Sequence, residues 1–236
     1  MQDNVMPTGK WEFNQEVTNC FDEMLSRSIP AYADMRALTE RLGSKFVQRK
    51  TAIVDLGCST GEAIKPFVSK YGAQNQYKLF DVSEPMLEEC KKRYSGWIDN
   101  GLMTVENFDI RNGIDKNISA SLVLSVLTLQ FTPIEYRQKI VQSIYNSLNY
   151  GGCFILVEKI LGSNYEIDNL LVDEYYRIKG EHSYTQEQIS AKRKSLEGVL
   201  VPITAKWNEQ LLESAGFKKI DCFYRYLNFA GWIAIK

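Results

Sequence analysis

Short apolar runs alternate with amphipathic segments along most of the chain, and this alternation predicts an α/β protein. Apolar runs of about four to eight residues bounded by turn-forming residues are typical of buried strands. Runs of this kind predict strands at residues 52–56, 77–81, 103–109, 121–129 and 153–160. The run 121–129 is rich in Val and Leu and apolar on both faces, as expected of a central parallel strand.

Amphipathic segments between these runs predict helices. Ser83 followed by Glu84-Pro85 is a good helix start, because serine caps a helix and proline suits its first turn. Glycines punctuate the ends of other helical segments. The predicted helices cover residues 62–71, the segment from 84 onward, 136–148 and 207–215. Strands that alternate with helices in this way favour a doubly wound, mostly parallel sheet with helices on both faces.

Three regions depart from the alternation. Residues 1–10 have the composition of a loose tail, and 11–50 look helical with a break at Ile29-Pro30, because proline disfavours helix in the residue before it. Residues 161–202 are polar and helical in pattern and predict an insertion over the sheet. Residues 218–235 predict two final strands in a hairpin. We therefore expect a tail and helical lid over 1–50 and a ligand-binding domain over 51–236.

Composition narrows the class of protein. The chain has 236 residues, 44% of them hydrophobic, and a formal net charge of −1, which fits one large domain without a global attraction to nucleic acid or anionic membranes. His182 is the only histidine, and the N-terminus lacks the pattern of a signal peptide. No apolar run approaches the roughly 20 residues of a membrane span. The five dispersed cysteines predict reduced thiols in a cytoplasmic protein without a metal site.

A glycine-rich turn and two carboxylates carry the predicted chemistry. Asp55-Leu-Gly-Cys-Ser-Thr-Gly61 follows the first strand, where glycines allow a tight turn and a close approach of backbone to ligand. Asp81 ends the second strand, 20 residues after Gly61, and a carboxylate there can accept hydrogen bonds from ribose hydroxyls. Asp109 ends the predicted third strand, where it can meet an adenine amino group. These residues predict a nucleoside site at the carboxyl edge of the sheet.

Other functions fit parts of this pattern less well. Gly57-x-Ser59-x-Gly61 matches the nucleophile elbow of hydrolases, but that fold needs strands before the elbow, and the match leaves Asp81 and Asp109 without a role. A nicotinamide dehydrogenase is disfavoured by Ser59, which stands where that fingerprint has its second glycine. A non-catalytic cofactor-binding protein stays open, since no essential base is visible.

The motif Asp-Leu-Gly-Cys-Ser-Thr-Gly resembles the first motif of class I S-adenosylmethionine-dependent methyltransferases, and the end of the chain after Ala215-Gly216-Phe217 is similar to the end of that fold. This resemblance covers about residues 51–236. It implies a Rossmann-like fold with a seven-stranded sheet and one antiparallel strand near its edge, and S-adenosylmethionine as the cofactor.

A narrower resemblance extends over nearly the whole chain. The matching segments are Phe21 to Met24, Arg27-Ser28-Ile29-Pro30 with Tyr32, Thr128-Leu129-Gln130-Phe131, Lys192-Arg193 and Asn228-Phe229, and together they resemble the carboxy-S-adenosyl-L-methionine synthase family. That resemblance implies a reaction of S-adenosylmethionine with prephenate, whose released carboxyl group is captured beside the sulfonium. The product serves modification of a tRNA wobble uridine. The partners implied are a small-molecule substrate and a second copy of the chain in a homodimer. Direct binding to nucleic acid or to a membrane is not expected.

The same resemblance assigns residues. Positions that the family uses on the cofactor are Tyr32, Gly57, Cys58, Ser59, Asp81, Asp109 and Ile110, and the motif adds Asp55 and Gly61. Arg193 matches the arginine that grips the added carboxylate, for which a planar guanidinium is suited. With Tyr32 it is the predicted catalytic residue. Two cofactor-binding positions depart from the family, because Val126 replaces an asparagine and Val82 replaces a polar residue.

The departures leave a conventional methyltransferase, acting on a small molecule or tRNA, as the alternative. Three site residues also have simpler interpretations. Arg193 fits an exposed helix face, and Tyr32 fits a core position. Cys58 fits a small side chain that fills the turn rather than a reactive thiol. Arg193 discriminates the two functions, since an inward side chain favours a carboxylated ligand and an outward one removes that support.

Overall fold

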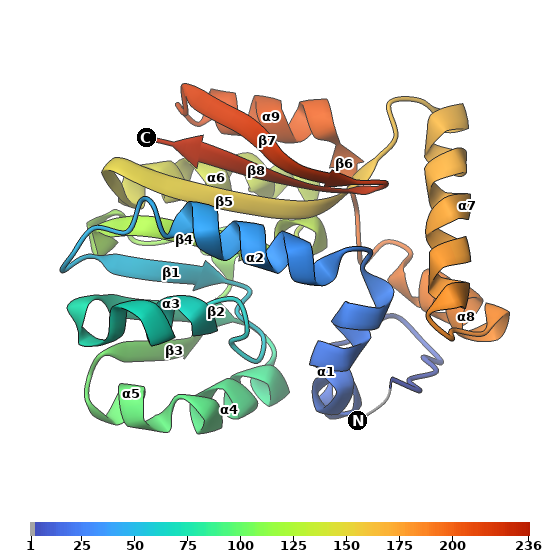
Figure 1. The fold of residues 1–236 in the computed structure, drawn as a ribbon, viewed down its shortest axis with the longest axis horizontal. Coiled ribbons are helices and arrows are strands. Elements are labelled where there is room, and N and C mark those ends of the chain that lie inside the picture. Colours follow the sequence, from blue (N-terminus) through green and yellow to red (C-terminus); the bar gives the residue numbers. More distant parts are fainter. Residues whose placement is uncertain (1–2) are drawn as a thin grey trace.

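Seven strands form one continuous sheet in the order β3-β2-β1-β4-β5-β8-β7 (Figure 1). This computed structural model describes residues 3–236. The strands are β1 (Ala52–Leu56), β2 (Gln76–Asp81), β3 (Met103–Asn107), β4 (Ala120–Val126), β5 (Leu148–Leu161), β7 (Lys219–Tyr226) and β8 (Phe229–Ile235). Strand β8 is antiparallel to both of its neighbours, and the other pairs in this path are parallel. The predicted mostly parallel sheet and final hairpin are confirmed, and a two-residue strand, β6 (Ile203–Thr204), pairs with β5 in addition.

Helices cover both faces of the sheet, as the alternation predicted. The helices are α1 (Gln15–Ser28), α2 (Tyr32–Gly43), α3 (Lys65–Tyr71), α4 (Glu84–Arg93), α5 (Ser95–Asp99), α6 (Ile134–Ser147), α7 (Tyr165–Glu181), α8 (Gln186–Leu196) and α9 (Ala205–Ser214). Side chains of β4 point alternately to the two faces. Leu122 and Leu124 pack with residues of α2, α3 and α4, whereas Val123 packs with residues of α6 and α9. The central strand is therefore buried on both sides.

The predicted break between the first two helices is confirmed. Helix α1 ends at Ser28, where Ile29 is extended, and Ala31 then takes a left-handed backbone with φ of 49° before α2 begins. The Tyr224 hydroxyl donates to the Pro30 carbonyl at 2.9 Å and fixes the bend against β7. The bend lets α2 cover the sheet while α1 extends beyond the carboxyl ends of the strands (Figure 1).

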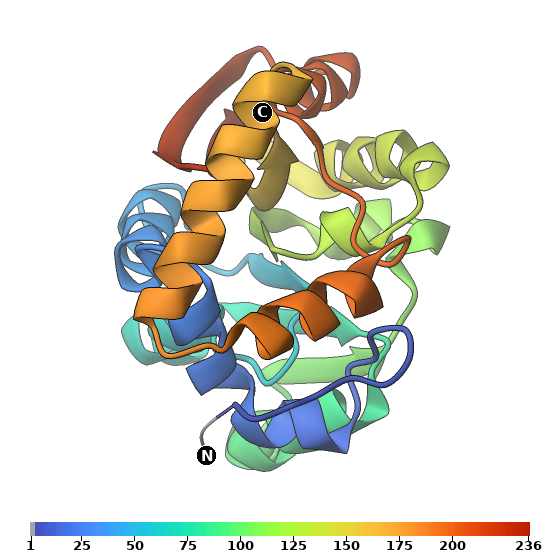
Figure 2. The same ribbon diagram turned by 90° about the vertical axis from the view of Figure 1, so that its right-hand side faces the viewer.

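The insertion forms α7 and α8, which stand beyond the same end of the sheet as α1 (Figure 2). The Ser28 and Tyr184 hydroxyls lie 2.9 Å apart, and the His182 ring bonds to the Arg27 carbonyl at 2.7 Å. These contacts join segments more than 150 residues apart in the sequence. The two regions predicted separately as lid and insertion therefore meet above the glycine-rich turn.

The segment predicted as a loose tail is anchored at Asp3, its first described residue. Asp3 is 1% exposed, its carboxylate accepts from the Tyr184 hydroxyl, and it lies 3.1 Å from the Lys192 ammonium. The Trp11 backbone N–H donates to the Ser195 carbonyl at 2.9 Å. The tail lacks regular secondary structure but is anchored by tertiary contacts that its local sequence cannot reveal. Residues 1–2 lie outside the description.

Several predicted boundaries differ from the structure. Strand β4 ends at Val126 rather than residue 129, because Leu127 adopts a left-handed backbone with φ of 61°. Strand β5 begins at Leu148 and includes Gly151 and Gly152, whose backbone groups bond to those of Lys236. Strand β3 ends at residue 107 and α3 starts at residue 65. Within residues 3–236, every helix is too short or too polar to cross a bilayer.

Candidate functional site

A cavity of about 570 Å³ lies at the carboxyl ends of the central strands, under α1, α7 and α8. This volume falls in the range of about 300–1,000 Å³ that small-molecule sites occupy. Its walls come from the glycine-rich turn, the ends of β2, β4 and β5, the N-terminal segment and the insertion. The position is the one where open α/β sheets bind their ligands.

The turn after β1 is held close to β2 and to the loop after β4. The backbone N–H groups of Gly57 and Cys58 both donate to the Phe80 carbonyl, at 2.8 and 3.0 Å. Gly57 has a φ of 71°, and a Cβ placed on it would lie 2.2 Å from the Thr128 side chain. This glycine is therefore required both by its backbone conformation and by the approach of Thr128.

Asp81 organises the same turn. One carboxylate oxygen, Oδ2, accepts the Ser59 N–H at 2.8 Å, and Oδ1 accepts the N–H groups of Val82 and Ser83 at 2.8 and 2.9 Å. Burial raises the pKa of Asp81, and these three bonds oppose that shift. A carboxylate offers about four acceptor sites, so about one stays free for a ligand hydroxyl. The predicted bonds to both ribose hydroxyls would require a backbone donor to share its acceptor.

Asp109 lies on the cavity but is not at a strand end. It caps the short helix Ile110–Asn112, and its carboxylate pairs with the Arg111 guanidinium, whose Nε lies 2.7 Å from Oδ2. The hydrogen bonds from Arg111 hold the pKa of Asp109 below its usual value. The assignment to an adenine amino group stays a prediction, and it would require Asp109 to share its acceptor sites with Arg111.

Four other predicted residues line the cavity. Val82 and Ile110 follow the neighbouring strands β2 and β3, so they offer apolar surface at one end, where Val82 is 62% exposed. Val126 lines the cavity at the end of β4, and Tyr32 lines it from the start of α2. Burial raises the pKa of Tyr32, which keeps its hydroxyl neutral near pH 7. Gly57, Cys58 and Ser59 complete the predicted set on the cavity.

Three predicted site residues do not line the cavity. Asp55 is 1% exposed beneath the turn, where burial raises its pKa to about 7. Gly61 has a φ of 82° and packs against Tyr94 and Cys90. Arg193 is exposed on α8. Asp55 and Gly61 thus shape the turn from below. Arg193 is absent from the cavity lining, so the structure gives no geometric support to its predicted contact with a carboxylate.

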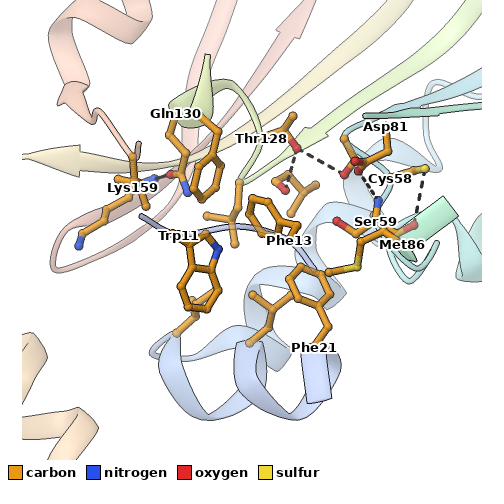
Figure 3. Close-up of a pocket in the computed structure, with 18 of the residues that line it drawn as sticks. Trp11, Phe13, Phe21, Cys58, Ser59, Asp81, Met86, Thr128, Gln130 and Lys159 are labelled. Carbon is orange, nitrogen blue, oxygen red and sulfur yellow. Dashed lines mark hydrogen bonds between the residues drawn. The ribbon is translucent and has the colours of Figure 1, made fainter. Parts of the chain in front are cut away.

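Three lysines line the other end of the cavity, and of these only Lys192 belongs to a segment that the sequence analysis singled out. Lys159 is at the carboxyl end of β5, Lys179 is on α7, and Lys192 is on α8. Figure 3 shows Lys159 and Asp81 on opposite sides of the site, with Phe13 between them. Lys159 could have been found from the sequence, because the charged pair Glu158-Lys159 lies inside an apolar strand. No local pattern marks Lys179.

Aromatic rings from the N-terminal segment line the space between the two ends (Figure 3). The rings of Phe13 and Phe131 are 5.1 Å apart, and those of Trp11 and Phe13 are 6.2 Å apart, both edge to face. With Phe21 they make this part of the cavity apolar. Phe21 and Phe131 belong to segments that carry the family resemblance, whereas Trp11 and Phe13 were missed because they lie in the segment predicted as tail and lid.

The loop after β4 is fixed from below by Glu158. Its Oε1 accepts the Leu129 N–H at 3.0 Å, and the Gln130 side chain accepts the Lys159 N–H at 2.6 Å. Burial raises the pKa of Glu158 to about 8, although the Arg137 charge opposes this. These bonds hold the segment Thr128-Leu129-Gln130-Phe131 in place, and all of its residues except Leu129 line the cavity.

Comparisons with known proteins agree with this geometry. Residues 53–152 match the family model described as a methyltransferase domain. The chain is 35% identical over 225 residues to a carboxy-S-adenosyl-L-methionine synthase of Methylococcus capsulatus, covering 95% of this chain and 93% of that protein. It is also 35% identical over 228 residues to the protein of that name from Staphylococcus epidermidis, covering 96% of this chain and 97% of that protein.

Solved structures support the fold. Phosphoethanolamine N-methyltransferase 2 of Haemonchus contortus, in complex with S-adenosyl-L-methionine, superposes with a TM-score of 0.68 at 12% identity, covering 95% of this chain and 57% of that one. Human N-acetylserotonin methyltransferase superposes with a TM-score of 0.59 at 16% identity, covering 94% of this chain and 55% of that one. The chain has the class I methyltransferase fold of an S-adenosylmethionine-dependent transferase, and its similarity over nearly full length places it in the carboxy-S-adenosyl-L-methionine synthase family.

Proposed function

We propose that this protein converts S-adenosylmethionine and prephenate into carboxy-S-adenosylmethionine. The observation that carries the proposal is the 35% identity to named synthases over 95% of the chain. The cavity supports it, because a nucleoside-type end and a cationic end face each other across an apolar middle. Two ligands of different chemistry suit such a site better than one.

The cofactor end fits an S-adenosyl group. The glycine-rich turn leaves backbone exposed to the cavity, and Asp81 keeps about one acceptor site for a ribose hydroxyl. Val82 and Ile110 would flank the adenine, and Tyr32 would lie beside the methionyl part. Arg36, which also lines this end, offers a cation for the methionyl carboxylate. No residue is needed as a strong base if the sulfonium acidifies its own methyl group.

In the overall reaction a C–H bond at the methyl carbon and the bond between the prephenate ring and its carboxylate both break. A new carbon–carbon bond joins the methyl carbon to the carboxylate carbon. The ring loses hydroxide and becomes aromatic, giving phenylpyruvate, and the hydroxide takes up the methyl proton as water. The contribution of this chain is alignment of the two substrates and exclusion of water, for which the rings of Trp11, Phe13 and Phe21 supply apolar walls.

The test is mass spectrometry of the products after incubation with both substrates. Carboxy-S-adenosylmethionine and phenylpyruvate formed in equal amounts, and absent without prephenate, is the expected result. The alternative is a conventional methyltransferase, which the exposed Arg193 and the valine at position 126 favour. In that case S-adenosylmethionine stays unchanged with prephenate and becomes S-adenosylhomocysteine with another acceptor.

We further propose that Arg193 turns inward to grip the added carboxylate, that residues 1–50 and 161–202 act together as a lid, and that the chain forms a homodimer. A cytoplasmic location is supported by five free cysteines in the described part of the chain. The role of the product in tRNA modification follows from the family resemblance. Light scattering of the purified protein tests the dimer, and loss of product affinity in Arg193→Ala tests the carboxylate contact.

A further inference from the structure

The cationic end of the cavity holds an excess of positive charge. Lys159, Lys179 and Lys192 all line it. Of these three lysines only Lys192 forms an ion pair with a described residue, Asp3, at 3.1 Å. Lys179 is 4% exposed and has no carboxylate within ion-pair distance in the described part of the chain. A buried ammonium without a partner is costly, and natural proteins keep such groups mainly where a ligand supplies the partner.

Aromatic rings separate and support the three ammonium groups. The Tyr175 ring lies 4.9 Å from the Lys159 nitrogen and 5.6 Å from that of Lys179. The Tyr184 ring lies 4.8 Å from Lys179 and 5.7 Å from Lys192. Ring faces hold the cations in place without neutralising them, so the positive charge stays available to an anion.

We propose that Lys159 and Lys179, assisted by Lys192, bind the side-chain carboxylate of a ring-bearing α-keto acid, the carboxylate that the reaction does not transfer. This inference rests on the proposed function. The ring would lie in the apolar middle of the cavity, and the other carboxylate would point to the cofactor end. An ion pair on the transferred carboxylate would stabilise it against loss, so the cations serve better on the retained one.

Burial supports this assignment. It lowers the pKa of Lys159 to about 8 and that of Lys179 to about 7, so the charged form of each lysine is destabilised in the absence of an anion. Replacing such a lysine with methionine should remove this cost of burying a charge. The two substitutions are therefore expected to leave the protein at least as stable as wild type, unlike the loss of a structural ion pair.

The experiment measures binding of phenylpyruvate by calorimetry to protein saturated with S-adenosylmethionine. Phenylacetone, which has the same ring and ketone without the carboxylate, is the matched probe. Wild type should bind phenylpyruvate more tightly than phenylacetone, and Lys179→Met or Lys159→Met should weaken phenylpyruvate by about tenfold or more, as expected for loss of a charge-assisted hydrogen bond. The affinities for phenylacetone and S-adenosylmethionine should stay within about twofold.

Lys194→Met is the control, because Lys194 is exposed on the same helix as Lys192 and lies outside the cavity lining. It should leave phenylpyruvate affinity unchanged. Equal phenylpyruvate affinity in wild type and in both cavity variants, no preference for phenylpyruvate over phenylacetone, or no binding to wild type would each overturn the inference. Binding is measured without turnover, so a failure to form carboxy-S-adenosylmethionine would instead overturn the proposed reaction.

Discussion

The Asp81 carboxylate accepts the Ser59 backbone N–H at 2.8 Å and so joins the ends of β1 and β2 at the cofactor end of the cavity. Asp81→Asn would turn an amide N–H₂ toward that donor while leaving the other oxygen bonded to Val82 and Ser83. We expect S-adenosylmethionine binding to weaken by about 1–3 kcal/mol, the range for a lost buried hydrogen-bond partner. Calorimetry measures the change. Glu106→Gln, an exposed change on β3, is the control, and an unchanged affinity in Asp81→Asn would refute the assignment of Asp81.

Gly57→Ala tests the approach of the Thr128 loop. The new Cβ would meet Thr128 at 2.2 Å at a backbone φ of 71°. Gly101→Ala is a matched control, since Gly101 has a φ of 67° and nothing within 4 Å of a Cβ. The backbone alone should cost about 1–2 kcal/mol in both variants. Chemical denaturation should therefore show a clearly larger loss for Gly57→Ala, with loss of cofactor binding. Equal losses would mean that the loop yields to the methyl group.

Glu158 should make stability depend on pH. Its pKa rises from 4.5 in the unfolded chain to about 8 in the folded protein, so the folded state binds more protons between these values. Stability is then fully present below about pH 4.5 and falls as pH rises toward 8, by up to ~1.4 kcal/mol per pH unit. Glu158→Gln removes this contribution and should gain stability relative to wild type across the window. Urea unfolding from pH 5 to 8.5 measures it, with exposed Glu88→Gln as control. A difference that stays constant with pH would contradict the account.

The lysine cluster should make the use of prephenate depend on pH. Burial lowers the pKa of Lys179 to about 7 and that of Lys159 to about 8, so kcat/KM for prephenate should fall as pH rises from 7 to 9. The Lys179→Met variant should lose the lower of these steps. Other charged groups close to these two lysines are Lys192, Arg27, Asp3, Asp168 and Arg193. A profile that is flat over this range in wild type would argue against an anion on the lysines.

Local sequence patterns predicted the strand ends and the helix break, because these features depend on residues that are adjacent in the sequence. The runs before Gly57 and Asp81 predicted two strand ends, and parallel neighbours bring these ends together. The break at Ile29-Pro30 was predicted because proline acts on the residue beside it. Strand β4 was extended too far, because the left-handed backbone of Leu127 is set by contacts and not by its own preference.

The cationic end could not be predicted, because three elements assemble it. Lys159, Lys179 and Lys192 belong to β5, α7 and α8, and the resemblance segment that contains Lys192 gave no sign that the other two lysines lie beside it. Asp3 looked like part of a loose tail for the same reason, since its partner lies 189 residues away. Arg193 shows that a family resemblance can suggest a role for a residue without predicting its position. A family resemblance predicted its role, whereas its exposure on α8 follows from tertiary packing, since Lys192 and Ser195 are the residues of this helix that contact Asp3 and Trp11.

The most direct test of the proposed reaction follows the ring carboxyl carbon of prephenate. The protein is incubated with S-adenosylmethionine and prephenate that carries a heavy carbon isotope in that carboxyl group, and the adenosyl products are analysed by mass spectrometry. The account predicts carboxy-S-adenosylmethionine that contains the heavy carbon, with unlabelled phenylpyruvate. Unchanged S-adenosylmethionine, or a carboxylated product without the label, would contradict it.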